Sequence, residues 1–133
     1  IIDVEPICKL KTKINFIKEI NKGESVSYSR KFIADKNMTL ATIPIGYADG
    51  LNRRLGNGHA YCLVNGQKAP YVGNICMDVC MIDVTDIDCR EGDKVIIFGD
   101  ELPVTVLADA LDTIPYEILT SVSNRVKRIY YQD

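Results

Sequence analysis

The feature that most constrains the fold of this chain is a series of short apolar stretches separated by glycine and asparagine turns. In residues 8–16, apolar and polar side chains alternate with a period of two, which predicts a half-buried strand. Its inward side is expected to carry Cys8, Leu10, Thr12, Ile14 and Phe16. Stretches of this length and period favour strands over long helices, so the chain is predicted to be mostly β.

Further strands follow from the same reasoning. The Asn65-Gly66 pair predicts a tight hairpin between two of them. The apolar run 75–84 is expected to be the longest buried strand, whereas 46–58, rich in glycine and asparagine, is expected to be a long loop. The other predicted strands are 24–28, 38–45, 61–64, 67–72, 94–98 and 126–131.

Only the last third of the chain has helical spacing. Residues 106–111 predict a short helix, and a second is expected from about Thr113 to Ser123, with Pro115 in its first turn. No linker or low-complexity segment divides residues 1–133, which are predicted to form one domain. The predicted fold is therefore a Greek-key β-barrel or sandwich with two short helices near the C-terminus.

Composition excludes several classes of function. The net charge is −2 and the chain is acidic overall, so no basic surface for nucleic acid is expected. The lysines between residues 9 and 18 are interpreted as the solvated face of a strand. No run of 18 apolar residues occurs, so no membrane segment is expected here. Because the chain begins at Ile1 without a methionine, it is expected to be a fragment.

The five cysteines do not predict a metal site. Their number is odd, no CxxC pair occurs, and His59 is the single histidine. His59 lies in a glycine-rich turn and is expected to be structural or solvent-facing. Free, mostly buried thiols in a reduced, cytoplasmic protein are the favoured interpretation. The cysteines are Cys8, Cys62, Cys76, Cys80 and Cys89.

Four residues are candidates for chemistry, and each has an ordinary alternative. Tyr28 precedes Arg30 and Lys31, whose charge would favour the phenolate and a proton-carrying role, although a surface aromatic is the simpler interpretation. Tyr47, in a glycine-flanked loop, would line a pocket mouth or pack on the barrel.

The other two candidates are an acid and a tyrosine. Asp78 lies within a predicted buried strand, where a carboxylate needs a partner, so a functional and a structural role are equally open. Tyr116, at the start of a predicted helix, would offer its hydroxyl to an anion or pack in the core.

Taken in order, five short motifs resemble a known family. They are 26–28 (VSY), 43–50 (IPIGYADG), 72–78 (VGNICMD), 114–117 (IPYE) and 124–128 (NRVKR). Together they resemble the C-terminal β domain of bacterial alanine racemases, which are pyridoxal-phosphate-dependent enzymes of fold-type III. The resemblance extends from about residue 6 to residue 131.

This resemblance implies that an amino-terminal TIM barrel, absent from this chain, holds pyridoxal 5′-phosphate on a lysine. It implies a homodimer in which the barrel of one subunit meets the β domain of the other. The implied activity is interconversion of L- and D-alanine for the bacterial cell wall. The chain alone is expected neither to bind the cofactor nor to racemise alanine.

The resemblance also implies roles for individual residues. Tyr28 matches the catalytic tyrosine that exchanges the α-proton on the face used by L-alanine. Met77 matches a residue whose backbone amide binds the substrate carboxylate, and Asp78 is its neighbour. Tyr47 matches a tyrosine that narrows the entryway, and Tyr116 matches one near the cofactor phosphate.

Two entryway positions and one backbone position complete the comparison. Arg53 matches an entryway arginine, and Asn74 stands where the family usually has arginine. Ser29 stands where glycine often follows the catalytic tyrosine. Because Asn74 removes a charge from the entryway, a serine racemase of the glycopeptide-resistance type is one alternative. A non-catalytic β binding module is another.

Overall fold

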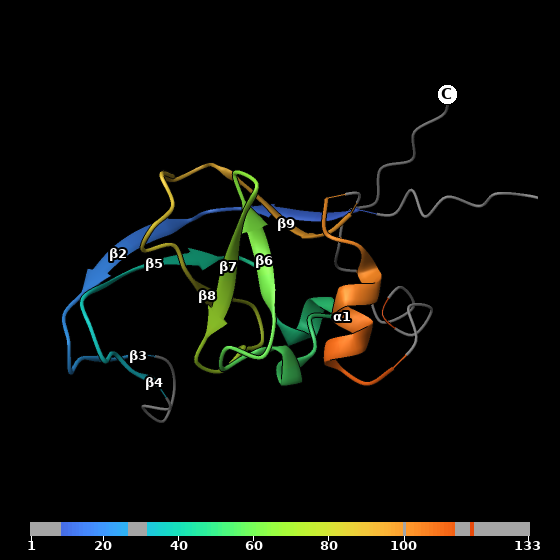
Figure 1. The fold of residues 1–133 in the computed structure, drawn as a ribbon, viewed down its shortest axis with the longest axis horizontal. Coiled ribbons are helices and arrows are strands. Elements are labelled where there is room, and N and C mark those ends of the chain that lie inside the picture. The colour runs from blue at the N-terminus through green and yellow to red at the C-terminus, as the bar shows by residue number, and fades with distance from the viewer. Residues whose placement is uncertain (1–8, 27–31, 100, 114–117, 119–133) are drawn as a thin grey trace, which may run out of the picture.

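The computed structural model describes residues 9–26, 32–99, 101–113 and 118, and Figure 1 shows their arrangement. Their strands form a seven-stranded antiparallel sheet, with the order β1-β9-β6-β7-β8-β5-β2, and a small β3–β4 hairpin. The strands are β1 (Leu10–Lys13), β2 (Phe16–Ile20), β3 (Ser25–Val26), β4 (Phe32–Ile33), β5 (Met38–Ile43), β6 (Tyr61–Val64), β7 (Gln67–Val72), β8 (Cys80–Asp83) and β9 (Lys94–Phe98). Helix α1 is Val104–Ala110, and two 3-10 helices, η2 and η3, are Tyr47–Asp49 and Arg53–Leu55.

The sheet curls until its two edges meet. Strands β1 and β2 lie at opposite ends of the strand order, yet only Ile14 and Asn15 separate them. The Ile14 amide donates to the Asp93 carbonyl, just before β9, at 3.0 Å, and the Asn15 amide donates to Thr42 on β5 at 2.8 Å. Neighbouring residues therefore join opposite edges of the sheet, which curls it into a half-barrel.

Strands β6 to β9 form a Greek key. Three consecutive hairpin-connected strands are followed by β9, which returns to pair beside β6. The β6–β7 turn has φ of 50° at Asn65 and 80° at Gly66, the positive values that a two-residue hairpin turn needs. The predicted mostly β, Greek-key barrel and the Asn-Gly hairpin are confirmed.

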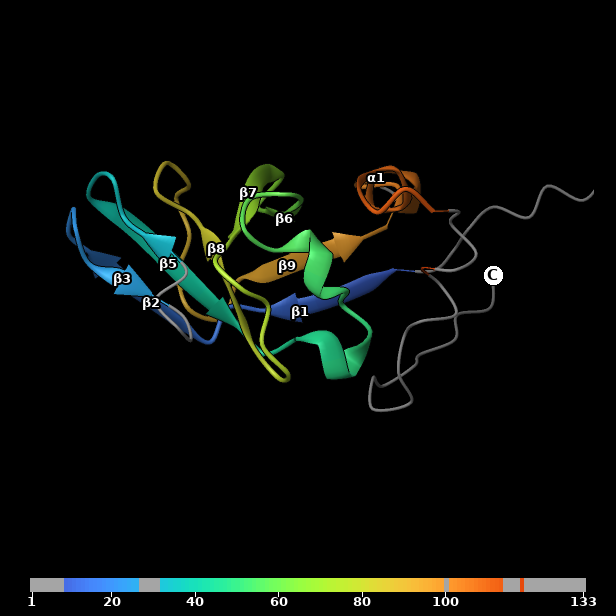
Figure 2. The same ribbon diagram turned by 90° about the horizontal axis from the view of Figure 1, so that it is seen from below.

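The core lies inside the barrel and continues under α1. Inward side chains of the strands are buried, among them Val64, Tyr71, Ile82 and Ile97, and Leu107 of α1 packs against the same cluster. Figure 2 shows α1 at one end of the molecule and the β3–β4 hairpin at the other. The core therefore holds one end of the barrel to the helix.

The predicted strand at 75–84 is wrong over its first half. Only Cys80–Asp83 pairs as β8, and the preceding residues form a loop in which Met77 is 50% and Val79 39% exposed. The backbone of this loop bonds to another loop instead of to a strand. An apolar run does not by itself distinguish a buried strand from a loop with exposed apolar side chains.

The predicted alternation at 8–16 holds only as far as Ile14. Leu10 and Ile14 are buried and Lys11 and Lys13 exposed, but Phe16 is 64% exposed. The chain leaves β1 and enters β2 between Ile14 and Phe16, and this break between two differently paired strands changes which side faces the core. Cys8 lies outside the described residues.

The predicted helix at 106–111 is confirmed as α1, Val104–Ala110. Of the second predicted helix, Thr113 and Ile118 alone are described, and the predicted strand 126–131 lies outside the described residues. Within the described ranges, no helix has the length and apolar character needed to cross a membrane.

The cysteines that the structure describes are all free thiols. Burial raises the pKa of the Cys62 thiol to about 12 and also raises that of Cys80, so both stay protonated at neutral pH. His59 is exposed, and its Nε2 lies 2.8 Å from the Ala110 carbonyl oxygen, which fits the predicted structural or solvent-facing position. Cys76 and Cys89 are half-buried.

Candidate functional site

Two loops that carry predicted site residues are joined backbone to backbone. The Tyr47 amide donates to the Cys76 carbonyl at 2.9 Å, and the Ala48 amide donates to the Met77 carbonyl at 3.0 Å. The helix η2 and the loop before β8 therefore lie side by side, although about thirty residues separate them in the sequence. Tyr47, which is 43% exposed, and Met77 are brought to one place on the surface.

A second set of contacts joins the same loops farther along. The Asn57 amide donates to the Gly73 carbonyl at 2.8 Å, and the Asn57 side chain donates from Nδ2 to Oδ1 of Asn74 at 2.9 Å. Asn57 has a φ of 56°, a conformation that asparagine adopts more readily than most residues. Asn74 is thus half-buried and bonded to the opposite loop.

Gly46 allows the two loops to approach this closely. A Cβ atom at position 46 would lie 2.2 Å from the Cys76 carbonyl oxygen and 2.4 Å from that of Met77. Its φ of −150° is ordinary extended backbone, so space and not conformation demands glycine here. Any side chain at this position would push the loops apart.

Asp49 fixes the turn that presents Tyr47. Its side chain is 9% exposed, and its Oδ2 accepts a hydrogen bond from the Gly46 amide at 3.0 Å. The Asp49 amide donates back to the Gly46 carbonyl at 3.0 Å, and Gly50 closes the turn with a φ of 106°. The sequence reasoning missed Asp49. The available signal was an acidic residue three positions after the residue that begins the turn, as in a capping box.

The bonding of Cys76 determines where the Met77 amide points. No described peptide bond is cis, and in a trans peptide the carbonyl and the following N–H point in opposite directions. Since the Cys76 carbonyl faces Tyr47, the Met77 N–H points away from η2. Among the described residues, no backbone carbonyl accepts a hydrogen bond from this N–H.

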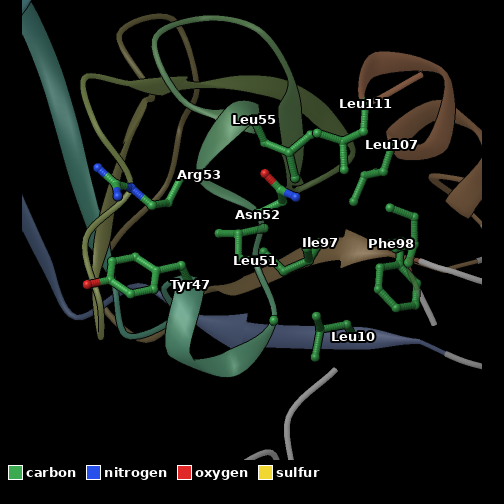
Figure 3. Close-up of a pocket in the computed structure, with 12 residues that line it drawn as sticks. Leu10, Tyr47, Leu51, Asn52, Arg53, Leu55, Ile97, Phe98, Leu107 and Leu111 are labelled. Atoms are coloured by element: carbon green, nitrogen blue, oxygen red, sulfur yellow. The ribbon is translucent and has the colours of Figure 1, made fainter. Parts of the chain in front are cut away.

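Tyr47 and Arg53 both line a cavity of about 350 Å³, which Figure 3 shows. The Arg53 guanidinium carbon lies 5.4 Å from the centroid of the Tyr47 ring, within the range of a cation–π contact. The cavity wall is mostly apolar and includes Leu10, Leu51 and Phe98. Tyr47 thus belongs to the wall of this cavity, and its role at an entryway stays a prediction.

Asp78 does not lie where the sequence placed it. The expected buried carboxylate inside a strand is wrong, because Asp78 is exposed in the loop that precedes β8. The structure brings together Tyr47, Arg53 and Met77. It does not describe the other predicted residues Tyr28, Ser29 and Tyr116.

Comparison with known proteins agrees with the resemblance of the motifs. A sequence model described as the alanine racemase C-terminal domain matches residues 7–130. The chain belongs to the alanine racemase C-terminal domain family. Alanine racemase of Clostridium novyi is 44% identical over 99% of the chain and 35% of that enzyme, and alanine racemase 2 of Caldanaerobacter subterraneus is 48% identical over 98% of the chain and 34% of that enzyme.

Solved structures give the same fold. Alanine racemase from Bartonella henselae, with covalently bound pyridoxal phosphate, has a TM-score of 0.88 and 41% identity over 92% of this chain and 34% of that one. The Bacillus anthracis enzyme with bound L-Ala-P has a TM-score of 0.86 and 39% identity over 94% of this chain and 33% of that one. This racemase domain spans about a third of the length of these relatives.

The lysines that the structure describes all lie at the surface of this racemase domain. A lysine that holds the cofactor by a Schiff base needs an enclosed, desolvated position to be reactive at neutral pH. Every described lysine is exposed: Lys9, Lys11, Lys13, Lys18, Lys22, Lys36, Lys68 and Lys94. Nor do the described side chains contain a group of three or more possible metal ligands.

Proposed function

We propose that the complete enzyme containing this domain interconverts L- and D-alanine with pyridoxal 5′-phosphate. The observation that carries the proposal is the match of nearly the whole chain to alanine racemases, at 44% identity over 99% of its length for the Clostridium novyi enzyme. The Clostridium and Caldanaerobacter relatives are named alanine racemases and not serine racemases, so the serine and binding-module alternatives have no support of this kind.

In this proposal the Met77 amide binds the carboxylate of alanine. Its N–H points away from η2 and has no backbone partner among the described residues, which suits an anionic acceptor. Asp78 is the neighbouring residue on the same loop. Tyr47 and Arg53 form one side of the entryway, where the arginine would attract the carboxylate, and Asn74 faces the other loop.

Two tyrosines outside the described residues complete the proposed site. Tyr28 exchanges the α-proton on the face used by L-alanine, and the charges of Arg30 and Lys31 would favour its phenolate. Tyr116 lies near the cofactor phosphate. When bound, pyridoxal phosphate stabilises the carbanion left by proton removal.

The cofactor lysine is proposed to come from an amino-terminal barrel, and the active site to form between the two subunits of a homodimer. The exposed apolar side chains of Met77, Val79 and Tyr47 support a protein contact at this surface. Free thiols suit a reduced compartment, so we infer a cytoplasmic enzyme. Supply of D-alanine for peptidoglycan is the proposed role.

The test is racemisation by the complete enzyme, as wild type and as Tyr28→Phe. Removal of a general base costs about 10²–10⁴-fold in rate, so we expect Tyr28→Phe to lose at least about a hundredfold in the L-to-D direction. Tyr61→Phe is the matched control, because Tyr61 is half-buried on β6 with the Lys68 ammonium 4.9 Å from its ring centroid, and it is not one of the proposed site residues. It should change the rate by less than about twofold.

The same assay is run with L-serine. Preference for alanine over serine is expected. A wild-type enzyme that prefers serine would contradict the proposed substrate and point to Asn74 as the cause. Full activity of Tyr28→Phe would instead show that the tyrosine is wrongly assigned.

A further inference from the structure

The one buried charged side chain among the described residues belongs to Asp49, and the proposed chemistry gives it no role. We propose that Asp49 is a positioning residue: by fixing the Gly46–Gly50 turn, it fixes the Cys76–Met77 peptide and aims the Met77 amide at the substrate carboxylate. This inference rests on the proposed function and adds a residue that controls how tightly the substrate is held.

The first step is the turn itself. The Asp49 Oδ2 accepts from the Gly46 amide at 3.0 Å, and the amides of Asp49 and Leu51 both donate to the Gly46 carbonyl, at 3.0 and 3.2 Å. Three bonds therefore meet at Gly46, and one of them comes from the Asp49 side chain. A side chain that is nearly buried holds its acceptor in one place, because it has little room to rotate.

The second step leads from the turn to the other loop. Residues 47 and 48 are the first two of η2, and their amides donate to the carbonyls of Cys76 and Met77 at 2.9 and 3.0 Å. These carbonyls belong to the peptides on either side of Met77. The orientation of η2 thus sets the orientation of both peptides, and with them that of the Met77 N–H.

The third step is that no free space remains between the two loops. The missing Cβ of Gly46 would come within 2.2 Å of the Cys76 carbonyl, so the two backbones already touch. On its other side, the Cys76 amide donates to the Val79 carbonyl at 3.0 Å, which closes the loop that carries Met77 and Asp78. If η2 shifts, the Met77 peptide has to turn with it.

The experiment uses the complete enzyme with Asp49→Ala, and it measures KM and kcat for alanine. It also measures the inhibition constant of propionate, a carboxylate without the amino group. We expect KM and the propionate constant to rise in parallel by about tenfold, the effect of weakening one hydrogen bond to a charged group, while kcat changes by less than about threefold. Unchanged KM and propionate binding, or a loss of kcat alone, would overturn the proposal.

Two further variants separate position from charge and remain informative if Asp49→Ala does not fold. Asp49→Asn keeps an acceptor at the same place without the charge, so KM should stay within about threefold of wild type. Asp49→Glu keeps the charge but moves the acceptor, so KM should rise. If KM rises more for Asp49→Asn than for Asp49→Glu, the charge of residue 49 matters and not the position of its acceptor, and the proposal is wrong.

Asp93→Ala is the matched control. The Asp93 Oδ2 accepts from the Arg90 amide, also three residues earlier and also at 3.0 Å, in a turn just before β9. Its loss should leave KM and propionate binding unchanged. If wild type fails to racemise alanine, the proposed function falls. If wild type is active and Asp49→Ala binds propionate normally, only the proposed role of Asp49 is contradicted.

Discussion

Two turns of this domain contain the same local hydrogen bond but differ in how deeply its carboxylate is buried. In both, an aspartate Oδ2 accepts from the amide three residues earlier at 3.0 Å: Asp49 from Gly46, and Asp93 from Arg90. The Asp93 turn is at the surface, where the carboxylate is further bonded by Asn65 at 3.1 Å. The backbone of each turn bonds to a distant segment, at Ile14 for the Asp93 turn and at Cys76 and Met77 for the Asp49 turn, but the Asp49 carboxylate is buried.

The glycines of the two turns show the same contrast. Gly92, beside Asp93, has a φ of 90° and open space where a Cβ atom would lie, so it serves backbone conformation. Gly46 has ordinary backbone angles and no space at all. A turn motif in a sequence therefore predicts that the chain reverses direction. Whether the turn contributes to a functional site depends on contacts with distant residues.

The largest effect is expected from Gly46→Ala. Its methyl group would overlap two carbonyl oxygens that cannot move without breaking the loop pairing, so we expect a loss of about 3 kcal/mol or more in the free energy of unfolding. Gly92→Ala, the control, should cost only the left-handed strain, about 1–2 kcal/mol. Urea unfolding of the two variants makes the comparison, and equal losses would contradict it.

A smaller effect is expected from removing the two carboxylates. Asp49→Ala leaves the buried Gly46 amide without this acceptor, so we expect a loss of about 1–3 kcal/mol in stability. Asp93→Ala should cost less, because water replaces an acceptor at the surface. Thermal melts measured side by side test the order, and a larger loss for Asp93→Ala would break the distinction between the turns.

The smallest effect concerns pH. Hydrogen bonds from the Arg90 amide and the Asn65 side chain lower the pKa of Asp93 below its ordinary value of 3.8. A carboxylate with a lowered pKa in the folded state stabilises the fold above its unfolded pKa, and this stability is lost as pH falls through the folded pKa. Wild type should therefore exceed Asp93→Asn in stability at about pH 6, and the difference should shrink below about pH 4.

The control for this pH series is Asp86→Asn, at an exposed aspartate. It should show a smaller difference from wild type near neutral pH. A difference between wild type and Asp93→Asn that stays constant down to about pH 2.5, well below the ordinary aspartate pKa, would mean that the carboxylate charge does not contribute.

Much of the barrel could be predicted because its signals are local. The Asn65-Gly66 hairpin needs positive φ at two adjacent residues, a demand that the two residue types themselves reveal. The alternation of Leu10, Lys11 and Thr12 likewise shows which side of β1 faces the core. Local chemistry was sufficient for these elements, and the prediction of a mostly β Greek key followed from them.

The rest depends on contacts between distant residues. The apolar run at 75–79 looked like a buried strand, but its carbonyls accept from η2, and Met77 and Val79 are exposed. No spacing within 75–84 contains this information. For the same reason, the periodicity of the sequence could not predict that Tyr47 lies beside Met77 or that Asp49 is buried. The resemblance of the motifs pointed to Tyr47 and Met77 but did not give their geometry.

The most direct test of the central claim is exchange of the α-proton of alanine with deuterium oxide, catalysed by the complete enzyme with Tyr28→Phe. If Tyr28 serves only the face used by L-alanine, L-alanine should lose its exchange by at least about a hundredfold, while D-alanine continues to exchange without racemising. Equal exchange of both enantiomers, at the wild-type rate, would contradict the account.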